Sequence, residues 1–403
     1  MEEWKEYKLH EIGRIVGGAT PPTKDSANYD GEISWITPKD LSNFTGRYIQ
    51  KGERSITQKG FESSSCQILP KGSILFSSRA PIGYIAIAAN ELCTNQGFKS
   101  IIPDNNLVNN LFLYYLLKYN KEEIEGLGSG TTFKEVSAKV MQNFDIKIPC
   151  IQTQKKIADI LSSLDDKIEL NKRINDNLEQ QAQALFKSWF VDFEPFKKGK
   201  FIDSELGMIP EGWQVEELGN ITNSITEKVG KRTDIKVLSP VNTGDLLLSE
   251  EYFTKQVYSK NLAKYIIVEP NDFAYNPARI NIGSIGMNTF DFSGCVSPVY
   301  VVFRCEKEYH HFFNIFKATK NFKEEVNTRA IGGVRQTLSY KDFSLIKIVY
   351  PPKEAVERFN KIYSHIMTLI KKNVLENKRL HQTRDTLLPK LMSGELKIND
   401  INN

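Results

Sequence analysis

The sequence contains few residue patterns that could catalyse a reaction. None of its five histidines forms the H-E-x-x-H spacing of a zinc hydrolase. The segment VGKR at 229–232 is only a fragment of a phosphate-binding loop, and no G-x-S-x-G nucleophile elbow occurs. NPAR at 276–279 lacks the second proline and the aromatic residue of an amino-methyltransferase motif. These patterns favour a binding protein over an enzyme, with no metal site.

Two arginines occupy similar positions next to glycine-containing turns. Arg79 lies in SSRAPIG, and Arg279 lies in NPARINIG, which begins with Asn276. A guanidinium group presented from such a turn can bind a phosphate or lie against the edge of a guanine. The alternative is that each arginine forms a salt bridge within its own domain.

Two further segments combine glycine with hydroxyl, amide and basic side chains, GSGTTFKE at 128–135 and IGGVRQTLS at 331–339. This composition fits a backbone that approaches a nucleic-acid strand, although a plain turn uses similar glycines. A basic cluster in the second half of the chain is another candidate, its alternative being a solvated loop. The predicted DNA contacts, besides Arg79, Asn276 and Arg279, are Ser129, Thr131, Thr132, Lys134, Lys231, Arg232, Arg335 and Gln336.

Composition sets broader limits on the protein. The chain has 403 residues, enough for two or three domains, and its five cysteines include no C-x-x-C pair, which favours a reduced, cytoplasmic setting. A net charge of +4 permits nucleic-acid binding only through a local basic patch. No apolar run approaches the roughly 20 residues that span a bilayer, so no membrane partner is expected.

The candidate residues occur in pairs because much of the sequence recurs. Trp4 and Leu9 recur as Trp213 and Leu218, and R-x-x-I-G at 79–83 recurs at 279–283. KEEI at 121–124 recurs as KEEV at 323–326, and NKRI at 171–174 as NKRL at 377–380. The order is kept at separations of about 200 to 209 residues, which predicts an internal duplication.

Each copy begins with a globular part that is predicted to be α+β. Short β-rich runs such as GSILF at 72–76 and PVYVVF at 298–303 alternate with Gly, Pro, Asn and Asp. One amphipathic helix is expected in each copy, near 107–125 and 308–327.

Each copy then continues into a long helix, near 152–190 and 353–392. Its apolar residues step alternately by four and three, which is a heptad pattern. At 1.5 Å per residue such a helix is roughly 55 to 60 Å long and needs a partner along its length. We expect the two helices to pair antiparallel under a pseudo-twofold relation that places the globular parts at opposite ends; the alternative is that each packs on its own domain. The predicted seam contains Ile157, Leu161, Leu164, Ile168, Asn171, Leu178, Phe359, Ile366, Ile370 and Asn377.

An aromatic segment, LFKSWFVDFEPF at 185–196, ends the first long helix. Trp189, Phe190 and Phe193 are expected either to dock the helix end on a globular domain or to present an apolar patch to a partner subunit.

This segment, together with SELGMIPEGWQVEEL at 204–218, TRDTLLPKLMSGEL at 383–396 and ISWITPKDL at 33–41, closely resembles the specificity subunit of type I restriction-modification systems. The resemblance implies two target-recognition domains, at 1–150 and 197–351, and two helical conserved regions, at 151–196 and 352–403. It implies no dependable list of base-reading residues, because recognition domains of this family vary greatly in sequence.

The resemblance also implies a role. Such a subunit reads a bipartite target in double-stranded DNA and directs two modification subunits and the restriction subunits to it, without catalysis of its own. S-adenosylmethionine, ATP and Mg²⁺ are then expected on the partner subunits, and no cofactor on this chain. The rival interpretations are a protein-binding scaffold and a self-sufficient nuclease or methyltransferase. Because the two copies differ at most positions, the two half-sites are expected to differ.

Overall fold

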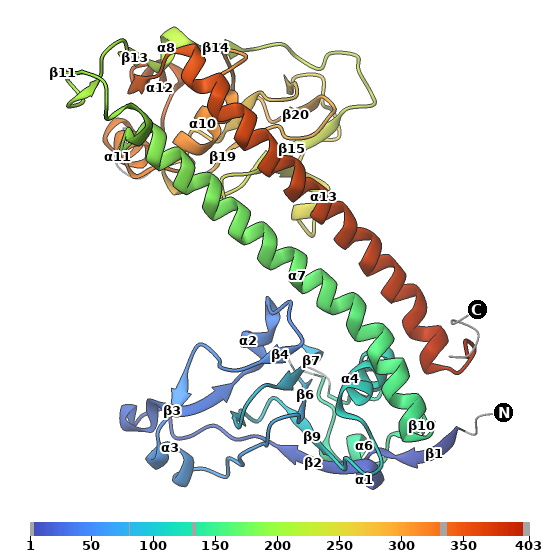
Figure 1. Ribbon diagram of the computed structural model, residues 1–403. Coiled ribbons are helices and arrows are strands. Elements are labelled where there is room, and N and C mark those ends of the chain that lie inside the picture. The colour runs from blue at the N-terminus through green and yellow to red at the C-terminus, as the bar shows by residue number, and fades with distance from the viewer. Residues whose placement is uncertain (1–3, 80, 131–133, 331–336, 398–403) are drawn as a thin grey trace. The chain divides into compact units, whose positions relative to one another are not determined.

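The computed structural model describes residues 4–79, 81–130, 134–330 and 337–397 (Figure 1). The chain divides into two compact units. Unit 1 comprises residues 1–173 and 373–403, and unit 2 comprises residues 174–372. Each unit therefore contains one globular part and one portion of each long helix.

The globular part of unit 1 contains short strands and short helices. Its strands are β1 (Lys5–Lys8), β2 (Gly13–Gly17), β3 (Tyr29–Ile36), β4 (Tyr48–Ile49), β5 (Ser55–Ile56), β6 (Ile74–Ser78), β7 (Ile82–Ala88), β8 (Cys93–Thr94), β9 (Lys99–Pro103) and β10 (Asp145–Ile148). Its helices are α1 (Leu9–Ile12), α2 (Pro38–Ser42), α3 (Gln58–Glu62), α4 (Asn110–Tyr119), α5 (Lys121–Gly126), α6 (Ala138–Gln142) and the 3-10 turn η1 (Ser26–Asn28).

The globular part of unit 2 contains a similar series. Its strands are β11 (Phe201–Ile202), β12 (Ile209–Pro210), β13 (Gln214–Glu217), β14 (Thr222–Ile225), β15 (Lys236–Pro240), β16 (Leu246–Leu248), β17 (Ile266–Val268), β18 (Phe273–Tyr275), β19 (Ile285–Met287), β20 (Gly294–Val296), β21 (Val301–Cys305) and β22 (Lys347–Tyr350). Its helices are α8 (Leu218–Ile221), α9 (Ser249–Tyr252), α10 (His310–Phe316), α11 (Lys320–Arg329), α12 (Tyr340–Ser344) and the 3-10 turns η2 (Glu194–Phe196) and η3 (Ile280–Ile282).

The sheets of the two units have matching topology. The order β2-β9-β6-β7 in unit 1 corresponds to β14-β21-β18-β19 in unit 2, and each run is antiparallel. In each second sheet one pair is parallel, β3 with β8 and β15 with β20. A separate antiparallel pair, β1 with β10 and β13 with β22, joins the start of each globular part to its end. The predicted duplication and the α+β class are confirmed.

The helix expected in each globular part is broken in two. In unit 1 the break falls at Asn120, whose backbone ends α4 before α5 begins at Lys121. In unit 2 the side chain of Thr319 accepts a hydrogen bond from the backbone N–H of Phe322 at 3.3 Å, and this cap starts α11 in a new direction. Caps act locally, so the periodicity of apolar residues did not reveal them.

The long helices are α7 (Ile151–Phe190) and α13 (Lys353–Met392), each of 40 residues. In unit 1 Asp165 and Asn171 of α7 contact Arg384 and Asn377 of α13, so the residue numbers fall along α13 as they rise along α7 (Figure 1). Ring contacts between Trp189 and Phe359 continue this order in unit 2. The predicted antiparallel pair is confirmed.

The hydrophobic cores lie between the sheets and the long helices. In unit 1 buried residues of β6, β9 and α4 pack with Ile157 and Leu161 of α7 and Leu391 of α13. In unit 2 buried residues of β18, β21 and α10 pack with Phe186 of α7 and Phe359 of α13. Each long helix thus packs both on its partner helix and on the globular parts.

Candidate nucleic-acid interface

In unit 1 the predicted contacts from two segments meet at one edge of the five-stranded sheet. Arg79 directly follows β6, and its backbone pairs with Glu135. Glu135 in turn pairs with Ser129 through two backbone hydrogen bonds of 3.0 and 2.9 Å. We call Arg79, Lys99, Ser129, Lys134 and Glu135 the unit 1 edge. Separate stretches of sequence therefore supply one surface.

The carboxylate of Glu135 links the cations of the unit 1 edge. Its Oε1 lies 3.2 Å from Nζ of Lys99, and its Oε2 lies 3.8 Å from Nη1 of Arg79. The Arg79 side chain remains 36% exposed. An ion pair this open contributes on the order of 0 to 1 kcal/mol, so the guanidinium can exchange Glu135 for an external phosphate or base at little cost. Arg79 thus forms the salt bridge within its own domain that the alternative interpretation predicted, and its side chain nevertheless stays accessible to solvent.

In unit 2 three chain segments leave the four-stranded sheet at the equivalent edge. Tyr275, the last residue of β18, lies opposite both Val301 of β21 and Ile285 of β19. The residues immediately beyond these strands are Asn276 and Tyr300, so they leave the sheet from neighbouring strands. We call Asn276, Arg279, Ile282, Val299 and Tyr300 the unit 2 edge.

The turn that carries Arg279 is built by local hydrogen bonds. The Asn276 side chain accepts from the backbone N–H of Ala278 at 3.0 Å, and the backbone N–H of Arg279 donates to the Asn276 carbonyl at 2.9 Å. Gly283 closes the turn with φ of 94°, where a Cβ atom would also lie 2.7 Å from the carbonyl oxygen of Asn242. Only glycine fits this position without strain.

Arg279 itself points into solvent. Its side chain is exposed, and no ion pair among the described residues includes it. Arg279 lowers the pKa of the neighbouring Tyr300 phenol electrostatically, but burial outweighs this effect and raises that pKa overall. The guanidinium is therefore available to an external anion.

The second glycine-rich segment of each copy reaches the same edge as the arginine. In unit 1 the backbone N–H of Val136 donates to the carbonyl of Ser78 at 2.9 Å. In unit 2 the backbone N–H of Leu338 donates to the carbonyl of Pro277 at 3.1 Å. The predicted contacts Thr131, Thr132, Arg335 and Gln336 lie outside the described residues, but the chain next to them is anchored there.

Lys231 and Arg232 occupy a different loop, ahead of β15. Arg232 lies 3.5 Å from Glu227 through Nη2 and Oε1, and its side chain is 54% exposed. No contact between this loop and the unit 2 edge is seen among the described residues. The position of this loop is therefore consistent both with a solvated surface loop and with a second segment that contacts DNA.

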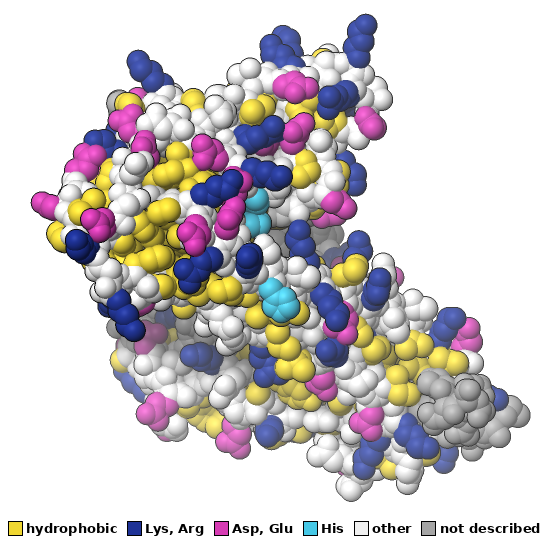
Figure 2. Space-filling view, turned by 45° about the horizontal axis from the view of Figure 1, so that its top comes forward, with side chains coloured by type: hydrophobic (Ala, Val, Ile, Leu, Met, Phe, Trp, Pro, Cys, Tyr) yellow, Lys and Arg dark blue, Asp and Glu magenta, His cyan; other side chains and the backbone are white. Residues whose placement is uncertain are grey.

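Charge is mixed on the face of the molecule shown in Figure 2, where Lys and Arg side chains lie among Asp and Glu side chains. This agrees with the modest net charge of +4 and means that any phosphate contact is local.

The predicted seam residues lie between the two long helices or between a long helix and a globular part. Two of the ten, Leu164 and Leu178, are half-buried and the other eight are buried. In unit 1 Nδ2 of Asn171 donates to Oδ1 of Asn377 at 2.9 Å, and Nδ2 of Asn377 donates to the Ile168 carbonyl at 3.4 Å. A buried amide pair of this kind fixes the register of the two helices.

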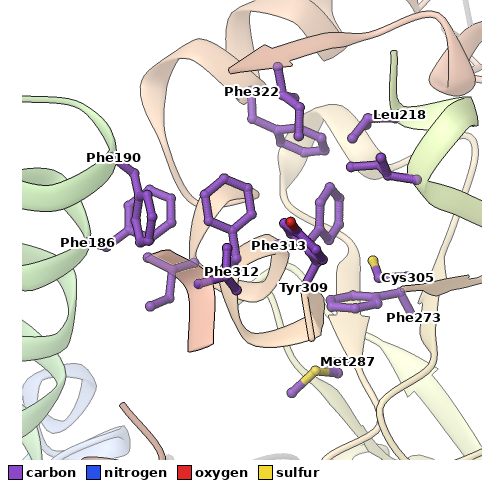
Figure 3. Packing of buried hydrophobic residues seen from close by; sticks show 14 of the residues in the cluster. Phe186, Phe190, Leu218, Phe273, Met287, Cys305, Tyr309, Phe312, Phe313 and Phe322 are labelled. Atoms are coloured by element: carbon purple, nitrogen blue, oxygen red, sulfur yellow. The ribbon is translucent and has the colours of Figure 1, made fainter. Parts of the chain in front are cut away.

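The aromatic segment at the end of α7 packs within unit 2. Phe186 and Phe190 project from α7 toward Phe312 of α10, with ring centroids 5.2 and 5.0 Å from it (Figure 3). Trp189 and Phe193 are half-buried, and Phe193 lies 5.3 Å from the ring of Trp213. Phe193 also has φ of 54°, a left-handed conformation at the residue that precedes the 3-10 turn η2. These contacts match docking on a globular part, and the exposed portions of Trp189 and Phe193 leave a partner contact open.

Five residues of the two edges were not anticipated from the sequence: Lys99, Glu135, Ile282, Val299 and Tyr300. All but Ile282 reach their edge through strand pairing between segments far apart in the chain. Glu135 directly follows the predicted Lys134, and its acidic side chain beside a basic loop was the one available signal.

Comparisons with known proteins agree with this architecture. Residues 1–180 match the family described as type I restriction modification DNA specificity domain. The specificity subunit of the type I restriction enzyme MjaIX from Methanocaldococcus jannaschii is 35% identical, over 99% of this chain and 95% of that protein. The HindI specificity subunit from Haemophilus influenzae is 26% identical, over 98% of this chain and 100% of that protein.

A solved structure shares the fold. The type I restriction-modification S subunit from M. genitalium superposes with a TM-score of 0.60 at 16% identity, covering 97% of this chain and 96% of that one. Within the part of the chain that the structure describes, no helix combines the length and apolarity needed to span a bilayer.

The family match and the 35% identity to the MjaIX subunit together identify the family. The chain belongs to the type I restriction enzyme specificity subunits, which are distinct from the methylase and nuclease subunits and are not themselves enzymes.

Proposed function

We propose that this chain reads a bipartite target in double-stranded DNA, with one half-site bound at the unit 1 edge and the other at the unit 2 edge. The observation that carries the proposal is the repeated construction of the edges. In each unit, the turn that carries the arginine is hydrogen-bonded to the end of a glycine-rich segment, and this happens at the corresponding end of the corresponding sheet. Arginine is the side chain best suited to bind a phosphate or a guanine edge.

The two half-sites differ in sequence under this proposal. The unit 1 edge presents two lysines, an arginine, a hydroxyl and a carboxylate, whereas the unit 2 edge presents an arginine, an amide, a phenol and two aliphatic side chains. Base edges in the major groove are distinguished by donors, acceptors and the thymine methyl group, so different side chains select different bases. The recognition domains proposed here are residues 1–150 and 197–351, and the helical regions between and after them act as a ruler for the unread spacer.

The chain acts together with catalytic partners in this proposal. Two modification subunits methylate adenine with S-adenosylmethionine, and restriction subunits use ATP and Mg²⁺; these cofactors are bound by the partners. The supporting facts are the family of the chain and the names of its relatives, which are specificity subunits of type I restriction enzymes. The half-exposed Trp189 and Phe193 are proposed contacts for a modification subunit or for the adjacent domain.

Methylation-aware sequencing of the host genome, with and without this gene, tests the proposal. The expected result is a two-part methylated motif that disappears when the gene is deleted. In a second assay, the reconstituted complex with modification subunits should bind a duplex carrying that motif with an affinity that falls steeply as salt rises. An unchanged methylome, or an affinity for the motif that is independent of salt, would contradict DNA reading and favour a protein-binding scaffold.

A further inference from the structure

Two aliphatic side chains at the unit 2 edge are unusually open to solvent. Val299 is 70% exposed and Ile282 is 60% exposed, the two highest values among the large hydrophobic side chains that the structure describes. Single exposed apolar residues are common on protein surfaces. Here two of them lie at one polar site, and neither belongs to the apolar cores of the unit.

Both residues belong to loops that the sheet brings together. Ile282 ends the turn begun by Asn276, and its backbone N–H donates to the carbonyl of Arg279 at 3.2 Å. Val299 sits in the turn that leads into β21, where the backbone N–H of Tyr300 donates to the carbonyl of Ser297 at 3.0 Å. The two loops meet at the end of β18, because Tyr275 lies opposite both Val301 of β21 and Ile285 of β19. An exposed cation, an amide and two aliphatic groups thus share one edge.

The corresponding isoleucine in the first copy is buried. Ile82 follows Arg79 by the same three residues as Ile282 follows Arg279, yet Ile82 is only 5% exposed and packs in the core of unit 1. The backbone also differs, because Ile82 begins strand β7 whereas Ile282 ends the 3-10 turn η3. Exposure of the isoleucine is therefore a property of unit 2 and not of the duplicated motif.

The chemistry of this edge fits one feature of DNA. In the major groove, thymine alone presents a methyl group, and apolar side chains read it by burying it. We propose that Ile282 and Val299 contact the 5-methyl group of a thymine in the half-site read by unit 2, next to the base or phosphate bound by Arg279. This inference rests on the proposed function and names a base that the half-site must contain.

Deoxyuridine substitution tests the contact, because it removes the methyl group and leaves every hydrogen-bonding group of the base in place. The complex of this chain with its modification subunits is titrated with target duplexes in which each thymine of both half-sites is replaced in turn. At one position the affinity of the wild-type complex should fall roughly four-fold, the effect of one buried methyl group. Val299→Ala combined with Ile282→Ala should bind the thymine and deoxyuridine duplexes equally.

The control variant is Val374→Ala, whose side chain is 58% exposed but lies on α13. It should keep the full thymine preference. All three substituted side chains are exposed, so loss of folding is not expected to obscure the result. Specific binding that is indifferent to deoxyuridine at every position, or a target half-site without thymine, would overturn the inference while leaving the proposed function intact. Absence of any sequence-specific binding would instead overturn the proposed function.

Discussion

Units 1 and 2 share a topology, and each packs an apolar core on the long helices, but the chemistry added to that packing differs. In unit 1 the addition is a buried polar network. Asp165 of α7 accepts from the Tyr115 hydroxyl at 2.6 Å and from Nη1 of Arg384 at 2.6 Å. Arg47, whose side chain is only 5% exposed, forms an ion pair with Asp166 on the same helix. The contact is directional and charged.

In unit 2 the corresponding contact is aromatic. Phe359 of α13 is fully buried and lies within 5.1 to 6.3 Å, between ring centroids, of Phe186, Trp189 and Phe190 of α7. Phe312 of α10 packs against Phe186 and Phe190 from the globular side (Figure 3). Burial of this much aromatic surface stabilises the contact without requiring one geometry for each pair. One fold thus tolerates either solution, which places fewer constraints on a duplicated sequence as its two copies diverge.

The largest expected effect tests the aromatic contact. Phe359→Ala should lower the free energy of unfolding of unit 2 by about 4 kcal/mol, because it removes a large side chain from a filled core. Phe359→Leu should recover most of this loss, since an apolar side chain of intermediate size still fills much of the space. Hydrogen exchange under increasing urea, followed in peptides of 174–372, measures both. Equal losses for the two variants would show that the rings matter for more than volume.

The next effect tests the polar network. Asp165→Asn should destabilise unit 1 by about 3 kcal/mol, because the nearly isosteric amide removes the buried carboxylate at 2.6 Å and leaves the buried Arg384 guanidinium with only the exposed Asp385. The matched control is Asp385→Asn, which removes a 61% exposed carboxylate from the same guanidinium and should cost less than about 1 kcal/mol. Urea unfolding followed by hydrogen exchange in unit 1 distinguishes them. If a conservative change is tolerated at Asp165 as well as at Phe359, the contrast between the units fails.

A smaller effect separates the two edges in DNA binding. Arg279→Ala should weaken binding of the complex to its target duplex by about 1 to 3 kcal/mol. Arg79→Ala should cost less, because Glu135 already balances part of its charge at 3.8 Å. Fluorescence anisotropy at several salt concentrations gives both values. Glu135→Gln is the informative companion, since freeing Arg79 and Lys99 should raise affinity at low salt. A larger loss at Arg79 than at Arg279 would contradict this reading of the edges.

The smallest effect concerns pH and unit 2. Burial lowers the pKa of His311 from 6.5 to about 3, with His310 and Lys371 adding to the shift. Between these values the unfolded chain binds a proton that the folded chain does not, so stability falls as pH drops below 6.5. Between pH 7 and pH 5.5 the loss from this one group is about 1 kcal/mol. His311→Phe should therefore show a flatter pH profile than the wild type in unfolding experiments, and parallel profiles would exclude the histidine as the cause.

The parts of the fold set by local sequence were predictable. The heptad pattern placed the long helices within a residue or two of their observed ends, and the repeated motifs indicated a shared topology. The break at Asn120 was missed because a helix cap adds only a local preference to a continuous apolar periodicity. Pro389 lies inside α13, near its end, although a proline there forgoes a helical hydrogen bond.

The candidate site was only partly predictable. Glycine turns and basic residues indicated Arg79 and Arg279, because those requirements are visible in a short stretch of sequence. Lys99 and Tyr300 were missed, since their places depend on the pairing of β9 and β21 with strands some 25 residues away. The exposure of Ile282 was unpredictable for a further reason: the identical motif in unit 1 turns its isoleucine inward.

The composition of unit 1 from two separate stretches determines when it can be completed during synthesis. Unit 2 is one continuous stretch, 174–372, whereas unit 1 needs residues 373–403 as well as 1–173. Leu388, Leu391 and Met392 belong to the core of unit 1. Gly394 passes close to the indole of Trp4, since a Cβ atom added at this glycine would lie 3.0 to 3.5 Å from the ring. The first globular part therefore emerges from the ribosome while the apolar face of α7 is still uncovered. More than 200 further residues must be made before the segment that covers this face emerges. The domain made first is the one finished last, and until then its uncovered apolar helix face is prone to aggregation.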